Sequence, residues 1–180
     1  MSRLDKAIVI VGAISSGKST LAKLISDRYG THIASFGGFL KDYSLRSNLP
    51  VDRTSLQNLG DEFIKSEPEE FLLKVIQFSG STSKALIFEG VRHSIILDLV
   101  KKHSFETLSI FIDVPIDVRK ERYLTRNKEI DSNKSLREFE IANSHIVEME
   151  IPALEQLCDL TISSFENQQL QTSLKKFYRA

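Results

Sequence analysis

The chain has 180 residues, 41% of them hydrophobic and 27% charged, so a single globular domain over residues 1–180 can bury a core of ordinary size. Its 24 Lys and Arg balance its 24 Asp and Glu, which excludes the strong basic excess of proteins that bind nucleic acids or anionic membranes by overall charge. The single cysteine, Cys158, excludes an internal disulfide and a cysteine-rich metal site. No apolar run approaches the roughly 20 residues that span a bilayer. We therefore expect a soluble, cytoplasmic monomer or homodimer without a membrane partner.

Short apolar runs alternate with amphipathic helical patterns along the chain. In chain order, the patterns predict a strand at 7–11, a helix at 21–29, a strand at 32–34, helices at 56–64 and 70–78, a loop at 79–84, a strand at 85–88, a helix at 95–102, a strand at 108–112, helices at 117–127 and 136–149, and a weaker strand at 160–162. Strands that are apolar on both faces and alternate with helices indicate a parallel sheet covered on both sides. We expect a three-layer α/β fold, with its chemistry at the carboxyl ends of the strands.

The most specific motif follows the first strand directly. Residues 12–19 read GAISSGKS, which matches G-x-x-x-x-G-K-[ST], and a predicted helix comes next. Glycines at both ends let backbone N–H groups turn inward onto a polyphosphate, at the positive end of the helix dipole. We expect Lys18 to reach the β and γ phosphates, and the Ser19 hydroxyl to ligate Mg²⁺. The residues expected to bind the nucleotide are Gly12, Ala13, Ile14, Ser15, Ser16, Gly17, Lys18, Ser19 and Thr20.

Two acids stand at strand ends where a second magnesium ligand is expected. Glu89 follows the strand at 85–88, and Asp113 follows the strand at 108–112. We favour Glu89, because Gly90 allows close approach of the backbone to a ligand and Arg92 brings an anion-binding guanidinium to the same turn. Asp113 is the alternative, and the acid that does not bind metal is expected to be a solvated strand end or a helix cap.

Arginines form a stripe on one face of the helix at 117–127. Arg119, Arg122 and Arg126 are spaced i, i+3 and i+7, and neither Arg119 nor Arg122 has an acid three or four residues away. Such a stripe favours an anionic partner, which in a phosphoryl-transfer site is the migrating phosphate. The alternatives are a solvated basic face and pairing with a distant acid. The polar residues 127–134 that follow (NKEIDSNK) are expected to form a short lid.

Together these residues resemble the nucleoside monophosphate kinase-like group of P-loop kinases, which includes adenylate kinase, deoxynucleoside monophosphate kinases and dephospho-CoA kinase. Residues 35–41 (SFGGFLK) are similar to the S-x-G-D-x-x-R segment of adenylate kinase-like members. Gly38 and Lys41 replace the acid and the acceptor-phosphate arginine of that segment. Residues 89–92 (EGVR) are similar to the D-G-x-x-R motif of the group, with Arg92 one position earlier.

The resemblance implies a P-loop kinase core, with a five-stranded parallel sheet, a small acceptor-binding insertion at about 36–80 and a short lid at 127–134. It also implies ATP and Mg²⁺. Arg122 and Arg126 match the R-x-x-x-R pattern of the lid helix. The residues expected to meet the migrating phosphoryl group are Lys18, Arg92, Arg122 and Arg126, and those expected to hold the acceptor are Lys41, Arg53 and Arg92.

The expected reaction is transfer of the ATP γ-phosphoryl group to a small phosphorylated acceptor, above all a nucleoside or deoxynucleoside monophosphate. One open alternative is a hydroxyl kinase of the dephospho-CoA type, which needs Asp42 or Glu89 as a general base. The other is an ATP-binding regulatory module with weak or no transfer. The zero net charge disfavours a nucleic-acid acceptor. His145 and Glu148, spaced i, i+3 on a predicted helix, are a weak metal signal, and we interpret them as an exposed polar pair.

Overall fold

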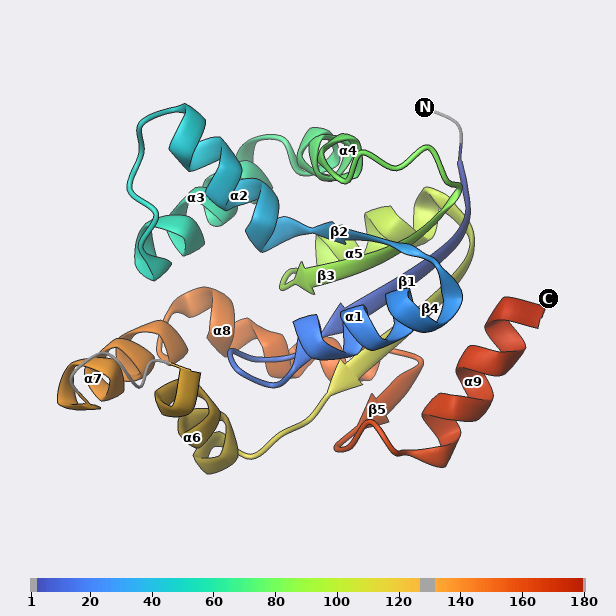
Figure 1. The fold of residues 1–180 in the computed structure, drawn as a ribbon. Coiled ribbons are helices and arrows are strands. Elements are labelled where there is room, and N and C mark those ends of the chain that lie inside the picture. The colour runs from blue at the N-terminus through green and yellow to red at the C-terminus, as the bar shows by residue number, and fades with distance from the viewer. Residues whose placement is uncertain (1–2, 127–131, 180) are drawn as a thin grey trace.

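The computed structural model describes residues 3–126 and 132–179, which form a parallel sheet between layers of helices (Figure 1). The strands run in the order β2-β3-β1-β4-β5, and neighbouring strands are parallel. This arrangement confirms the predicted three-layer α/β fold with a five-stranded parallel sheet. The strands are β1 (Leu4–Val11), β2 (His32–Ser35), β3 (Ala85–Val91), β4 (Ser104–Ile112) and β5 (Leu160–Ile162).

Helices cover both faces of the sheet. In Figure 1, α1 and α9 lie on one face, and α4 and α5 lie on the other. The α-helices are α1 (Lys18–Tyr29), α2 (Phe36–Arg46), α3 (Arg53–Ser66), α4 (Pro68–Phe78), α5 (Ser94–Lys102), α6 (Ile116–Arg126), α7 (Ser132–Asn143), α8 (Ile146–Glu150) and α9 (Gln168–Arg179), and a 3-10 helix, η1, spans Ile151–Leu157.

The central strand β1 contributes to two separate cores. Its residues Ala7, Val9 and Val11 pack into the core that also contains α4 and α5, and Ile8 and Ile10 pack into the core beneath α1 and α9. All of these side chains are buried, as expected for a parallel strand covered on both faces. The carboxyl end of β1 is therefore fixed from both sides, and the phosphate loop starts from a rigid support.

Two helices were not predicted. The Ser35 hydroxyl accepts the backbone N–H of Gly38 at 3.1 Å and so caps α2, whose first turn contains two glycines that obscure the helical pattern. In α9, Leu170, Leu174 and Phe177 are spaced i, i+4 and i+7 and are all buried. That spacing is an amphipathic helical signal that the sequence contains.

The prediction of one helix over 136–149 was wrong. Helix α7 ends at Asn143, and α8 begins at Ile146. Between them, His145 adopts an extended conformation (φ −62°, ψ 140°), and its Nδ1 accepts the backbone N–H of Val147 at 3.3 Å. The predicted lid covers residues 127–134, of which 127–131 lie outside the described residues. Residues 132–134 form the first turn of α7.

Strand β3 continues beyond its predicted end at 88 to Val91. Its pairing with β1 shifts by one residue, because Ile10 lies opposite Glu89 and Val11 lies opposite Val91. Gly90, at φ 91°, is the extra residue of this bulge. The bulge leaves Glu89 at the carboxyl end of the sheet, beside the phosphate loop.

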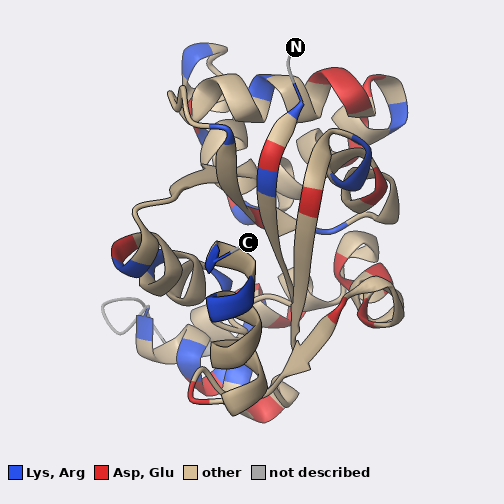
Figure 2. Ribbon diagram, turned by 90° about the vertical axis from the view of Figure 1, so that its right-hand side faces the viewer, with Lys and Arg blue, Asp and Glu red and all other residues tan. Residues whose placement is uncertain are grey.

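Charged residues of both signs are spread over the helices, as Figure 2 shows. On β1 and β4 the charged residues Asp5, Lys6 and Glu106 lie in the amino-terminal halves. The carboxyl halves of these strands contain no charged residue, so the charges near the phosphate loop come from other segments. In the part of the chain that the structure describes, no helix combines the length and the apolar character needed to cross a bilayer.

Candidate active site at the carboxyl end of the sheet

The phosphate loop is a tight turn that requires glycine at two positions. Gly12 has φ 153° and Gly17 has φ 103°. A Cβ atom on Gly12 would lie 2.7 Å from the Ser16 hydroxyl oxygen, and one on Gly17 would lie 2.8 Å from the Phe165 ring. Gly17 is also the N-cap of α1, so the loop ends at the positive pole of that helix. The loop therefore has the compact form that the motif predicts for a polyphosphate site.

Lys18 lies at the base of this loop and is 7% exposed. Its Nζ donates hydrogen bonds to the carbonyl oxygens of Gly12 at 2.7 Å and Ala13 at 2.8 Å. Burial and, next, the positive charge of Arg92 lower the pKa of Lys18 to about 7, although Glu148 acts in the opposite direction. A phosphate near this amine would favour its charged form and raise the pKa again.

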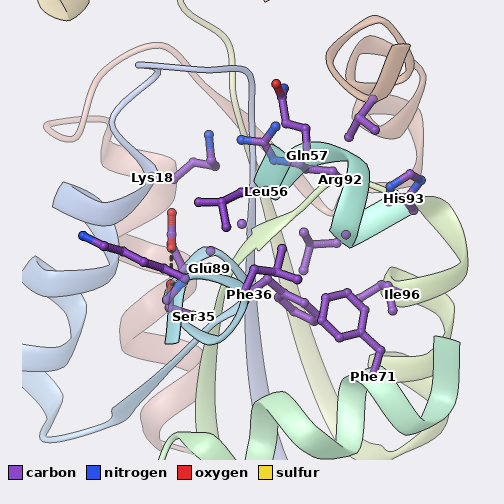
Figure 3. A pocket seen from close by; sticks show the side chains of 18 of the residues that line it. Lys18, Ser35, Phe36, Leu56, Gln57, Phe71, Glu89, Arg92, His93 and Ile96 are labelled. Carbon is purple, nitrogen blue, oxygen red and sulfur yellow. Dashed lines mark hydrogen bonds between the residues drawn. The ribbon is translucent and has the colours of Figure 1, made fainter. Parts of the chain in front are cut away.

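The predicted metal ligands Ser19 and Glu89 lie together. The Ser19 hydroxyl donates to Glu89 Oε1 at 3.0 Å. The Ser35 hydroxyl donates to Glu89 Oε2 at 3.0 Å, and Figure 3 shows these two side chains together. The alternative ligand, Asp113, is exposed at the end of β4, where its backbone N–H donates to the Ile162 carbonyl. Hydroxyl and carboxylate oxygens are the ligands that Mg²⁺ prefers, so this geometry favours Glu89 over Asp113.

Two cavities meet beside the phosphate loop. The loop cavity, of about 270 Å³, is lined by residues of the loop and of α6, among them Ile14, Ser15 and Arg126. The inner cavity, of about 380 Å³, extends between α2, α3 and the end of β3. Their shared wall consists of the residues that line both cavities, which are Lys18, Ser19, Arg53, Glu89 and Arg92. A group bound in one cavity therefore lies next to a group bound in the other.

An ion cluster that the sequence did not reveal joins two arginines of the shared wall to Glu148, which lies behind them. Glu148 Oε1 accepts hydrogen bonds from Arg92 Nη1 and, at 3.3 Å, from Arg53 Nη2. Its other oxygen, Oε2, accepts the backbone N–H of Ile14 at 2.8 Å. The interpretation of His145 and Glu148 as an exposed polar pair was wrong, because the Glu148 side chain is 1% exposed. His145 instead pairs with Asn58 at 3.0 Å, so the two side chains have different partners.

The arginines of α6 face the phosphate loop. Arg122 Nη1 donates to the Ser16 carbonyl at 3.1 Å, and Arg126 lines the loop cavity. Arg119 donates to the carbonyl of Ile14 at 3.3 Å and to Asn143 Oδ1 at 2.8 Å. Two arginines of the predicted stripe thus bind neutral oxygens of the loop or its surroundings and join α6 to the loop.

Of the remaining predicted residues, Lys41 lines the inner cavity together with Gln57 and His93. Asp42, one of the two candidate general bases, pairs with Arg46 at 2.9 Å on α2. Glu89, the other candidate base, is part of the shared wall. The structure therefore brings Lys41, Arg53 and Arg92 to the inner cavity, as the resemblance implied. These residues come from α2, α3 and the segment after β3, which are far apart in the sequence.

Comparison with known proteins places the chain among P-loop proteins. A family model described as an AAA domain matches residues 8–143. The cytidylate kinase of Sulfolobus acidocaldarius is 26% identical over 120 residues, which are 67% of this chain and 61% of that relative. The match thus spans less than two thirds of the relative's length.

Solved structures share the fold at low sequence identity. A shikimate kinase from Aquifex aeolicus superposes with a TM-score of 0.54 at 18% identity and covers 96% of this chain and 92% of its own. A sugar kinase from Janibacter sp. gives a TM-score of 0.57 at 17% identity, with coverage of 95% and 93%. These neighbours show that the chain shares its α/β fold with these two kinases.

Proposed function

Because the chain belongs to the AAA domain family of P-loop proteins, we propose that it is a kinase that transfers the γ-phosphoryl group of ATP to a small phosphorylated acceptor. The acceptor is a nucleoside or deoxynucleoside monophosphate. The resemblance to P-loop kinases in the sequence and the match to a cytidylate kinase both support this proposal.

The observation that carries the proposal is the shared wall of the two cavities. Phosphoryl transfer requires the donor phosphate and the acceptor to be adjacent, and to be surrounded by groups that stabilise the charge of the transition state. The wall supplies the amine of Lys18 and the guanidinium groups of Arg53 and Arg92 at the boundary of the cavities. In this proposal ATP binds with its phosphates in the loop cavity, and the acceptor binds in the inner cavity.

The lining of the inner cavity supports an acceptor with a flat aromatic ring. Away from Lys18, the Phe36 and Phe71 rings meet edge to face, with centroids 5.2 Å apart (Figure 3). The apolar residues of the lining are Phe36, Leu40, Leu56, Ile64, Phe71, Val91, Ile96 and Val147. A planar base fits such a surface, whereas a polyhydroxylated acceptor would leave its hydroxyl groups without partners there. The cations at the wall would then bind the acceptor phosphate.

Ser19 and Glu89 would hold Mg²⁺ with the phosphates of ATP. A bound Mg²⁺ would neutralise charge on the β and γ phosphates. A phosphate acceptor needs no general base, because its oxygen is already ionised. A hydroxyl acceptor would leave Glu89 as the base, because Asp42 is paired with Arg46 and lies outside both cavities.

The low pKa of Lys18 predicts that nucleotide binding takes up a proton. At about pH 8 the free protein would hold Lys18 mostly neutral, because its pKa is about 7. MgATP would raise that pKa and bind the charged form, so its affinity would fall as the pH rises from about 7 to about 9. Calorimetry in buffers of different ionisation enthalpy should give an uptake close to one proton at about pH 8 and much less at about pH 6. Uptake that persists in Lys18→Ala would contradict this assignment.

The proposed activity is tested by ADP release from MgATP against a panel of acceptors. The panel contains ribo- and deoxyribonucleoside monophosphates, with dephospho-CoA, shikimate and simple sugars as the hydroxyl acceptors. We expect one monophosphate or a small group of them to raise turnover far above the background, and chelation of Mg²⁺ to abolish the increase. If only a hydroxyl acceptor raised the rate of ADP release, a nucleoside monophosphate would be excluded as the acceptor. Binding of ATP without stimulation by any acceptor would favour a regulatory module.

A further inference from the structure

The proposed function assigns no role to Glu148. It lies on α8 and contacts the shared wall through Arg53 and Arg92, while its other oxygen binds the Ile14 N–H of the phosphate loop. These partners are 95, 56 and 134 residues away in the sequence. One carboxylate thus connects the loop that would hold the donor to the two arginines that would hold the acceptor.

The charge of Glu148 is required at this place. The Arg92 side chain is largely buried, with 16% of its surface exposed, and the positive charges of Lys18, Arg53 and Arg92 lie close enough to repel one another. Buried cations without a counter-ion are strongly unfavourable. Burial alone would raise the pKa of Glu148, but Arg92, Lys18 and the Ile14 N–H lower it below its usual value. Glu148 is therefore ionised at neutral pH.

Glu148 is also held in place by the packing of its own segment. Its neighbour Val147 is 3% exposed, and Ile151, which follows α8, is 1% exposed in the main core. The backbone of α8 therefore cannot shift away from the arginines unless these apolar side chains lose their packing.

We propose that Glu148 is a positioning residue for phosphoryl transfer, which orients Arg53 and Arg92 at the shared wall and joins them to the phosphate loop. This inference rests on the proposed function. Oε1 accepts one hydrogen bond from each guanidinium, so the other N–H groups of both arginines stay available to phosphate oxygens. Arg53 is 42% exposed, and a long side chain at such a position samples several rotamers unless it is anchored.

The test is the Glu148→Gln variant in the full chain, with Glu140→Gln as the matched control. Glu140 is an exposed residue of α7, so its variant makes the same charge change away from the cavities. We expect Glu148→Gln to lower kcat/KM for the acceptor by about 10- to 100-fold, because misplaced phosphate ligands have effects of this size. KM for ATP should stay within about twofold, since most of the phosphate loop is untouched.

A second comparison separates positioning from a general structural effect. If Glu148 acts through Arg92, the loss caused by Glu148→Gln should be much smaller in a protein that already carries Arg92→Met. If the double variant instead loses kcat/KM by the product of the two single losses, the residues act independently and the proposal is contradicted. An unchanged or increased kcat/KM for the acceptor in Glu148→Gln would also contradict it, since an increase would mean that the carboxylate competes with the substrate.

If Glu148→Gln fails to fold, Glu148→Asp takes its place. The shorter side chain keeps the charge but cannot reach Ile14 and both arginines together, so we expect the same selective loss in kcat/KM for the acceptor. Unchanged kinetics in folded Glu148→Asp would overturn the proposal. Absence of acceptor-stimulated turnover in the unmodified protein would instead contradict the proposed function, and this inference with it.

Discussion

Replacement of Lys18 by alanine is expected to lower kcat by about 10³-fold, the loss found when one preorganised donor to a transition-state oxygen is removed. Lys18 is the cation at the base of the phosphate loop, and it is part of the wall shared by both cavities. Its loss would remove the point charge that meets the phosphates of ATP. The measurement is ADP formation at saturating ATP with the acceptor identified from the panel.

The Lys18→Ala variant should remain folded, because burial disfavours the charged amine in the free protein and lowers its pKa to about 7. Thermal unfolding would verify this. Lys23→Ala is the matched control, since Lys23 lies on the same helix, is largely exposed and pairs with Asp27. Activity near the unmodified level in folded Lys18→Ala would remove the phosphate loop from the proposed mechanism.

Replacement of Arg92 by methionine is expected to lower kcat/KM for the acceptor by about 10³-fold, the lower end of the range for arginines that contact a transferring phosphoryl group. Arg92 lines both cavities, and Met keeps most of the length of the side chain without its charge. We expect KM for the acceptor to rise and kcat to fall together, because Arg92 would bind the phosphate before and during transfer. Steady-state kinetics with the acceptor varied at saturating ATP would show both changes.

Two further variants define what Arg92 contributes. Arg92→Lys should recover part of the loss, because it restores the charge but not the bidentate geometry. Arg28→Met is the matched control, since Arg28 is exposed on α1 and contacts Gln171, outside both cavities. Full activity in Arg92→Met would exclude Arg92 as a ligand of the acceptor phosphate.

Much of the fold followed from local sequence patterns. The apolar runs identified the strands, and Gly30 ended α1 where the sequence predicted, at φ 68°. Helix α2 was missed because its capping contact, from the Gly38 N–H to Ser35, stabilises a segment whose glycines disfavour a helix. The break at His145 was missed because its side chain caps α8 and binds Asn58, a residue 87 positions away.

The sequence by itself determined the phosphate loop, since its residues are consecutive and their conformation depends on glycines within the loop. It also limited the candidates for the second magnesium ligand to two acids at strand ends, Glu89 and Asp113. Only the tertiary structure distinguishes the surroundings of these acids, because the bulge at Gly90 and the hydroxyl groups of Ser19 and Ser35 orient Glu89 beside the phosphate loop.

Only the tertiary structure revealed Glu148. Its spacing from His145 suggested a helical surface, and nothing local distinguishes a buried carboxylate from an exposed one. Its burial depends on Ile14, Arg53 and Arg92, which folding brings together from three distant segments. A buried charge is stable only where such partners converge. Motifs of consecutive residues are therefore visible in the sequence, whereas an ion cluster built from long-range contacts becomes visible only when the chain has folded.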